Sequence, residues 1–130
     1  MPKDEPPQKS LMDKLGVKTG ARVSVLGVAD AAFRGDLRAR GADVSARRRK
    51  GTDLVFLALK GPGDLGKLGT LERWMTRNGA VWVVYPRGRR DLREVDVIAA
   101  GLAVGLVDNK IARFSDTHTS MRFVIPVARR

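Results

Sequence analysis

Eight basic side chains fall where the sequence predicts that strands end. In open α/β sheets, ligands bind outside the carboxyl ends of the strands. Neighbouring strands lie about 4.8 Å apart, so cations at the ends of four strands would share an edge roughly 15 Å long. Such an edge attracts the phosphates or carboxylates of a nucleic acid, a nucleotide or an acidic protein surface. The predicted anion-binding residues are Arg47, Arg48, Arg49, Lys50, Lys60, Arg87, Arg89 and Arg90.

The overall charge agrees with this interpretation but also permits a simpler one. The chain has 25 Lys and Arg against 14 Asp and Glu, a formal net charge of +11. A balance this basic favours an anionic partner, nucleic acid above all. The alternative is that these are solvated loop charges that bind only counterions and keep the protein in solution.

The residue types exclude several kinds of site. The chain has no cysteine, which excludes disulfides, thiolate metal sites and cysteine nucleophiles. His118 is the single histidine, so a multi-histidine metal site is excluded as well. His118 lies in a predicted polar loop with Asp116, Thr117 and Thr119, where no nucleophile partner for a catalytic triad can be identified. We expect no catalytic residue and no metal.

Residues 53–90 contain the elements that position most of these cations. The unbroken apolar run Leu54–Leu59 predicts a strand over Asp53–Lys60 that is buried on both faces. Ala80–Tyr85 predicts a second buried strand. Between them, apolar residues at three- and four-residue spacing predict an amphipathic helix from Asp64 to Gly79: Leu65, Leu68, Leu71, Trp74 and Met75. Strand, helix and strand form the repeating unit of a parallel sheet.

The remaining elements extend this unit on both sides. Before it, we expect a helix over Leu11–Leu15, a strand over Arg22–Gly27, a helix within 28–40 and a short strand over Asp43–Ala46. After it, we expect a helix from Asp91 to about Gly101 with Leu92, Val95, Ile98, Ala99 and Leu102 facing inward. The apolar segments Leu106–Phe114 and Met121–Val127 flank a polar turn and predict an antiparallel hairpin.

The length of 130 residues suits one domain with a sizeable core. Three prolines and four charges predict a disordered leader over residues 1–9, and residues 10–130 form the single α/β domain. No apolar run approaches the about 20 residues that span a bilayer. The N-terminus has no apolar segment of a signal peptide, so we expect a cytoplasmic protein.

The order of these elements resembles the class I S-adenosylmethionine (SAM)-dependent methyltransferase fold. KLGVKTGARVSVLG is similar to the run into its first strand, DLVFLALK to its fourth strand and NGAVWVVYP to its fifth. A closer resemblance is to a small bacterial family of unknown function, which shares the LG-[IV]-K-x-G opening and the GLVD segment. Its ending is matched here by Asp116, Thr117, Thr119, Ser120, Met121, Arg122, Phe123 and Val124.

The resemblance implies a cofactor loop that is degenerate in this chain. Methyltransferases hold SAM on an acidic-x-Gly-x-Gly-x-Gly turn, of which Gly27 supplies the first glycine and Val25 replaces the acid. Alanines stand at the later glycines, so the loop consists of Gly27, Ala29, Asp30 and Ala31. The ribose-binding acid at the end of the second strand is replaced by basic residues 47–50. Each such charge reversal costs up to about 4 kcal/mol at 4 Å and an effective dielectric of 20.

Together these observations predict a Rossmann-like three-layer α/β sandwich, with a mostly parallel sheet and a C-terminal antiparallel hairpin. We expect a non-catalytic, methyltransferase-like domain without a cofactor, which binds an anionic ligand or partner. A divergent SAM-dependent methyltransferase is the enzymatic alternative. A purely structural subunit is the third, and it would expose an apolar patch on the sheet edge.

Overall fold

The computed structural model describes residues 10–130, and the predicted leader, residues 1–9, lies outside the described residues. A six-stranded sheet with the order β2-β1-β3-β4-β6-β5 organises the chain. Its strands are β1 (Arg22–Leu26), β2 (Asp43–Ser45), β3 (Thr52–Ala58), β4 (Met75–Pro86), β5 (Val107–Arg113) and β6 (His118–Val124). The α-helices are α1 (Leu11–Lys14), α2 (Ala31–Ala39) and α3 (Glu94–Ala103), and the 3-10 helices are η1 (Pro62–Thr70), η2 (Glu72–Trp74) and η3 (Val127–Arg129).

The strand directions confirm the predicted topology. β1 pairs in parallel with β2 and β3, and β3 pairs in parallel with β4. The C-terminal hairpin is antiparallel, and its second strand, β6, lies between β4 and β5. The carboxyl ends of β1, β3, β4 and β5 therefore meet at one edge of the sheet, where β6 begins. We call this the carboxyl edge, and the other the amino edge.

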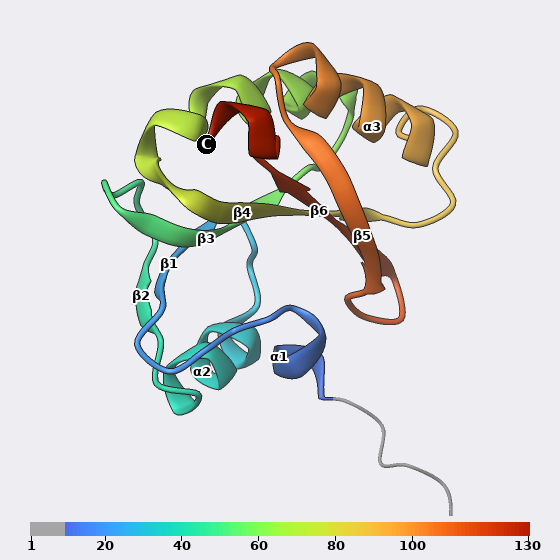
Figure 1. Ribbon diagram of the computed structural model, residues 1–130. Helices are drawn as coiled ribbons and strands as arrows, with labels where there is room; N and C mark the ends of the chain where they lie inside the picture. The colour runs from blue at the N-terminus through green and yellow to red at the C-terminus, as the bar shows by residue number, and fades with distance from the viewer. Residues whose placement is uncertain (1–9) are drawn as a thin grey trace, which may run out of the picture.

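Helices cover both faces of the sheet (Figure 1). α1 and α2 lie on one face, where Phe33 packs edge-on against Phe56 and Trp82 is fully buried. η1 and α3 lie on the other face, over Leu57 and Phe123. This arrangement confirms the three-layer sandwich. None of the helices within residues 10–130 has the length and apolar character needed to cross a membrane.

The predicted amphipathic helix over 64–79 is wrong. Residues 62–74 form the 3-10 helices η1 and η2, and Met75 already begins β4. Glycines at 63, 66 and 69 weaken an α-helix, while the three-residue spacing of Leu65, Leu68 and Leu71 matches the 3-10 period. Gly79 lies inside β4 instead of ending a helix, and a Cβ there would stand 2.9 Å from the Asp53 carbonyl oxygen.

The predicted inward face of the third helical segment is wrong in part, although Leu92 is buried and Ile98 packs against the core as predicted. α3 begins at Glu94, with Arg93 as N-cap, and Asp91 lies outside it. Val97 and Gly101 are buried against the sheet, whereas Val95 and Leu102 are 59% and 54% exposed. The helix is apolar on more than one side, so apolar spacing alone did not identify the buried face.

A short crossover without a helix joins β2 to β3. Residues 46–51 pass across β1, the strand that lies between them. The Ser24 hydroxyl of β1 donates to the Arg47 carbonyl oxygen at 2.9 Å, and the Thr52 hydroxyl donates to that of Arg49. Parallel crossovers usually take about a dozen residues or more, so hydrogen bonds hold this one where helix packing ordinarily would.

Candidate functional site

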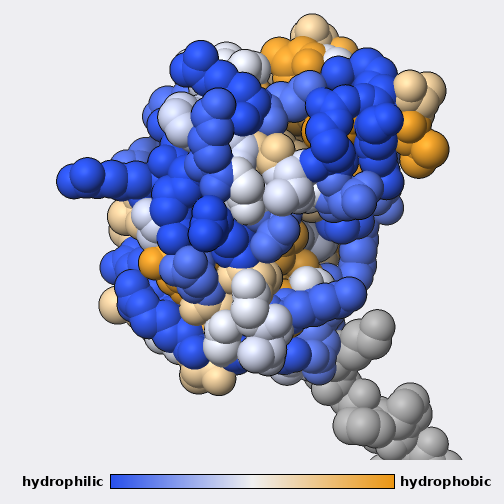
Figure 2. Space-filling model, turned by 60° about the vertical axis from the view of Figure 1, so that its left-hand side comes forward, coloured by the Kyte–Doolittle hydropathy of each residue, from blue (hydrophilic) through white to orange (hydrophobic). Residues whose placement is uncertain are grey.

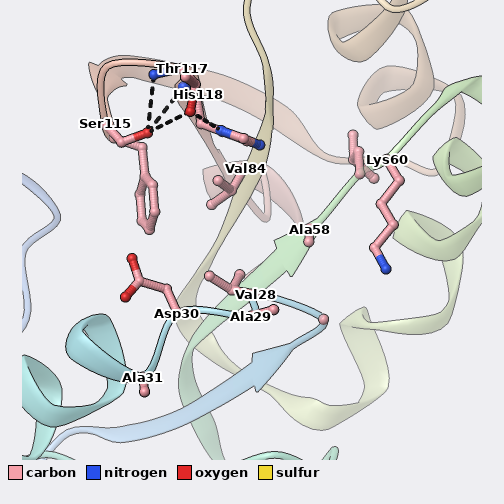
Figure 3. A pocket seen from close by; sticks show the side chains of 13 residues that line it. Val28, Ala29, Asp30, Ala31, Ala58, Lys60, Val84, Ser115, Thr117 and His118 are labelled. Atoms are coloured by element: carbon pink, nitrogen blue, oxygen red, sulfur yellow. Dashed lines mark hydrogen bonds between the residues drawn. The ribbon is translucent and has the colours of Figure 1, made fainter.

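A cavity of about 510 Å³ opens at the carboxyl edge beside the turn that follows β1. It lies on the α2 side of the sheet, and Figure 3 shows Asp30 on one wall and His118 on the other. All four residues of the predicted degenerate loop line it. We call it the Gly27 cavity, and its main lining residues are Gly27, Val28, Ala29, Asp30, Ala31, Ala58, Lys60, Val84, Phe114, Ser115, Thr117 and His118.

Gly27 and Asp30 give this turn its shape. Gly27 adopts a φ of +81°, which disfavours any side chain, and a Cβ there would contact the Ala58 Cβ at 3.5 Å. The Asp30 carboxylate accepts a hydrogen bond from the Phe33 amide at 3.0 Å and caps α2. The carboxylate beside the turn is therefore already engaged in a structural role.

His118 begins β6 instead of lying in the hairpin loop as predicted. Its Nδ1 lies 2.8 Å from the Thr117 hydroxyl, and its amide donates to the Ser115 hydroxyl at 3.1 Å (Figure 3). The described residues place no carboxylate in hydrogen-bond contact with the ring. This arrangement lacks the orienting acid of a triad.

A second hollow, about 350 Å³, lies on the η1 side of the same turn. Arg48, Lys60 and Lys67 line it together with a single carboxylate, Asp64. Asp64 accepts from the Lys60 amide at 2.7 Å and from the Lys67 ammonium at 3.0 Å. These contacts, the Lys60 amide first, lower the pKa of Asp64 and keep it ionised. We call this hollow, which Leu26, Gly27, Ala46, Leu57 and Ala58 complete, the cationic hollow.

A third depression, about 360 Å³, lies beyond the end of β4. Arg87, Arg89 and Arg93 line it with Tyr85, whose pKa is raised by burial and, secondarily, by the Glu94 charge. We call it the arginine groove. Arg89 links it to the cationic hollow, because its guanidinium donates to the Lys60 carbonyl oxygen.

Arg89 is largely neutralised by its neighbour Asp91. The two side chains form an ion pair with two hydrogen bonds. That contact with Arg89 lowers the pKa of Asp91, so the carboxylate stays charged beside the arginine. Of the arginines in the groove, Arg87 is therefore the better placed to meet a ligand, since no side-chain partner of Arg87 occurs among residues 10–130.

The eight predicted cations do not all share one edge. Arg49 donates to Asp43 and to the Val23 carbonyl oxygen, and the Lys50 carbonyl accepts from Arg22, the first residue of β1. Both residues therefore lie at the amino edge, because the crossover carries the chain back to the start of β3. Arg47 lies within the crossover. The remaining five stand at or just beyond the carboxyl edge: Arg48, Lys60, Arg87, Arg89 and Arg90.

Three further cations at this edge were missed. Lys67 lines the cationic hollow, and its position was hidden by the incorrect helix over 64–79. Arg93 precedes α3 instead of lying within it. Arg113 ends β5 and lines a small depression with Arg87 and Thr119. Its place could have been inferred, since the predicted strand 106–114 must end at the carboxyl edge.

No model of a known protein family matches the sequence, and no curated protein matches it. Solved structures do. A TehB-like SAM-dependent methyltransferase from Corynebacterium glutamicum superposes with a TM-score of 0.64 at 16% identity, over 82% of this chain and 81% of that one. A SAM-dependent methyltransferase from Aquifex aeolicus gives 0.65 at 12% identity, over 88% and 87%. A SAM-dependent O-methyltransferase from Thermotoga maritima gives 0.63 at 11% identity, over 95% and 68%.

This is a methyltransferase-like fold. At such identities the likeness concerns the fold alone. The version found here is truncated, because the segment that resembles the fourth strand of the methyltransferases, DLVFLALK, forms β3. The missing unit would lie between β2 and β3, where the crossover now runs.

The acids that the resemblance implies for a SAM site do not stand at their expected places beside the Gly27 cavity. β2 ends at Ser45 and is followed by Ala46 and Arg47, so no carboxylate stands there for ribose hydroxyls. The nearest acid in the turn, Asp30, already caps α2. Hydrophilic surface predominates on the face shown in Figure 2, with apolar patches between.

Proposed function

We propose that the protein is a non-catalytic, methyltransferase-like binding domain that holds an anionic ligand at the carboxyl edge of its sheet. We expect a phosphate-bearing ligand, and nucleic acid above all. The carboxylates of an acidic protein surface would be bound by the same cationic side chains. The cationic hollow is the proposed contact, and the arginine groove extends it along the edge.

The observation that carries this proposal is the charge of the cationic hollow. Three cations line it, and its single carboxylate, Asp64, is held by Lys67 and the Lys60 amide. Arg48 makes one hydrogen bond, to the Thr70 hydroxyl at 3.1 Å, and keeps its other donors for a ligand. Guanidinium and ammonium groups grouped in a depression favour phosphate over any cationic ligand.

Neutralising the cationic hollow is expected to weaken binding to a single-stranded oligonucleotide. The variant is Arg48→Gln, Lys60→Gln and Lys67→Gln together. Each lost phosphate contact reduces the slope of log K against log salt by about 0.7 for single strands, so the triple variant should lose about 2. Fluorescence anisotropy at several salt concentrations measures the slope, and elution from heparin gives an independent readout.

A matched control removes the same charge elsewhere. Arg38→Gln, Lys50→Gln and Arg73→Gln also takes away three positive charges, all on exposed side chains away from the hollow. This control should change the slope by less than half as much. Equal effects of the two triple variants would mean that net charge alone governs retention, and the proposed site would be abandoned.

The open Gly27 cavity favours the second candidate, a divergent SAM-dependent methyltransferase. Its volume and its place after β1 are the supporting observations. Isothermal titration with SAM distinguishes the two. We expect no heat of binding at micromolar concentrations, because the residues after β2 supply no carboxylate for the ribose and the cation Lys60 lines the cavity. Micromolar affinity would require us to withdraw the non-catalytic proposal.

A further inference from the structure

An arginine lies partly buried in the middle of the sheet, far from the residues proposed to bind the ligand. Arg122 belongs to β6, an internal strand, where it is the register partner of Trp82 on β4 and of Lys110 on β5. Side chains at such positions are ordinarily apolar, as Trp82 is. The presence of a partly buried arginine here calls for a physical reason.

No partner for this guanidinium exists among residues 10–130: the described side chains and carbonyl groups form neither a hydrogen bond nor an ion pair with it. The neighbouring charge that acts on its pKa is a cation. Arg130 is close enough to lower the pKa of Arg122 further, after burial itself. Lys110, beside it in the sheet, is directed to the Lys14 carbonyl oxygen at 2.8 Å. A partly buried charge without a protein partner is satisfied only by water or by a bound ligand.

Arg122 lines a cavity of about 390 Å³ that opens at the amino edge. The turn from Gly16 to Gly20 forms one wall and brings Lys18 to it, and Asn78 of β4 forms another. Around Gly16 and Gly20 an added Cβ would meet nothing within 4 Å, so the turn leaves open space. The carboxylate in this wall, Asp53, already accepts from the Arg22 amide at 2.9 Å. We call this the Arg122 cavity.

We propose that the Arg122 cavity is a second anion site, which binds a small oxyanion through the Arg122 guanidinium, the Lys18 ammonium and the Asn78 amide. A guanidinium offers paired N–H donors that match the two oxygens of a carboxylate or a phosphate. The site lies at the edge opposite the cationic hollow, so it is independent of the proposed function. A bound oxyanion would supply the charge that residues 10–130 do not.

Glycine amide signals in a ¹H–¹⁵N NMR spectrum test this site without interference from the other one. Gly16 and Gly20 line the Arg122 cavity, whereas Gly27 lines the cationic hollow. Titration of the wild-type protein with inorganic phosphate, and separately with malonate, is expected to shift Gly16 and Gly20 saturably. The anion that binds more tightly identifies the ligand as phosphate-bearing or carboxylate-bearing.

The matched variants are Arg122→Met and Arg48→Met. Arg122→Met should weaken the binding seen at Gly16 and Gly20 by at least about tenfold, while Arg48→Met should leave it within twofold. At ten times the dissociation constant, the anion should raise the melting temperature of the wild type by about 5 °C, but not that of Arg122→Met. Without the anion, Arg122→Met should melt no lower than the wild type, because it removes an uncompensated charge.

Two results would overturn the proposal. One is a wild-type spectrum in which neither anion moves Gly16 or Gly20, a measurement that needs no variant to fold. The other is an Arg122→Met protein that retains the wild-type shifts. A response to both anions that is confined to Gly27 is a case of the first result and would support only the cationic hollow.

Discussion

Trp82→Ala is expected to lower the free energy of unfolding by about 3–5 kcal/mol, the range for truncating a large buried side chain. Trp82 is fully buried at the centre of β4, and its register partner on β3 is the buried Phe56. Its indole N–H donates to the Leu15 carbonyl oxygen at 3.0 Å, which fastens the end of α1 to the sheet. Urea denaturation followed by circular dichroism measures the loss.

Two conservative variants separate the packing from the hydrogen bond. Trp82→Phe leaves the Leu15 carbonyl without its donor and should cost about 1–3 kcal/mol. Trp74→Phe removes an indole N–H that has no acceptor among residues 10–130, and Trp74 is only partly buried. That substitution should change stability by less than about 0.5 kcal/mol. If both cost the same, the bond from Trp82 to Leu15 would not fasten α1.

Gly101→Ala is expected to destabilise the protein although alanine is the better helix former. A Cβ at Gly101 would stand 2.0 Å from the Cε1 atom of Phe123, whose ring is fully buried and cannot swing aside. α3 or the β6 strand must then shift, and overpacking of this kind costs about 1–3 kcal/mol. The gain in helix propensity, about 1 kcal/mol, acts in the opposite direction and should be outweighed.

Gly35→Ala provides the matched control in α2. Gly35 is exposed within that helix, and an added Cβ would meet nothing within 4 Å. This variant should gain about 0.5–1 kcal/mol, the difference in helix propensity. Both midpoints are measured in the same urea series, at an unchanged m-value. Two glycine-to-alanine changes that stabilise equally would show that α3 does not depend on close approach to Phe123.

The strands were the most predictable part of the fold. The unbroken apolar run 54–59 identified β3, and the apolar residues after Gly79 identified the second half of β4. These runs are informative because a parallel strand that is covered on both faces buries nearly all of its side chains, so its residues are apolar without a break. The hairpin was predicted as well: β5 lies within one residue of the predicted segment 106–114, whereas β6 begins and ends three residues before the predicted segment 121–127.

Helical segments and the site were less predictable, for two reasons. Leucines spaced three apart suit a 3-10 helix as well as an α-helix, and the glycines between them decided the outcome at η1. The site required the path of each loop, which residue spacing does not give. Arg48 and Arg49 are adjacent in sequence, yet Arg48 lines the cationic hollow while Arg49 bonds Asp43 at the amino edge.

The helix-free crossover over β1 limits how this domain can grow. The surface of β1 beneath it carries Ser24, and β3 begins with the buried Thr52, so hydroxyl groups stand where a docking helix would require apolar side chains. A helix inserted between β2 and β3 would place its apolar face against those hydroxyl groups. New recognition segments are therefore better accommodated at the hairpin loop or ahead of α1 than in this short bridge.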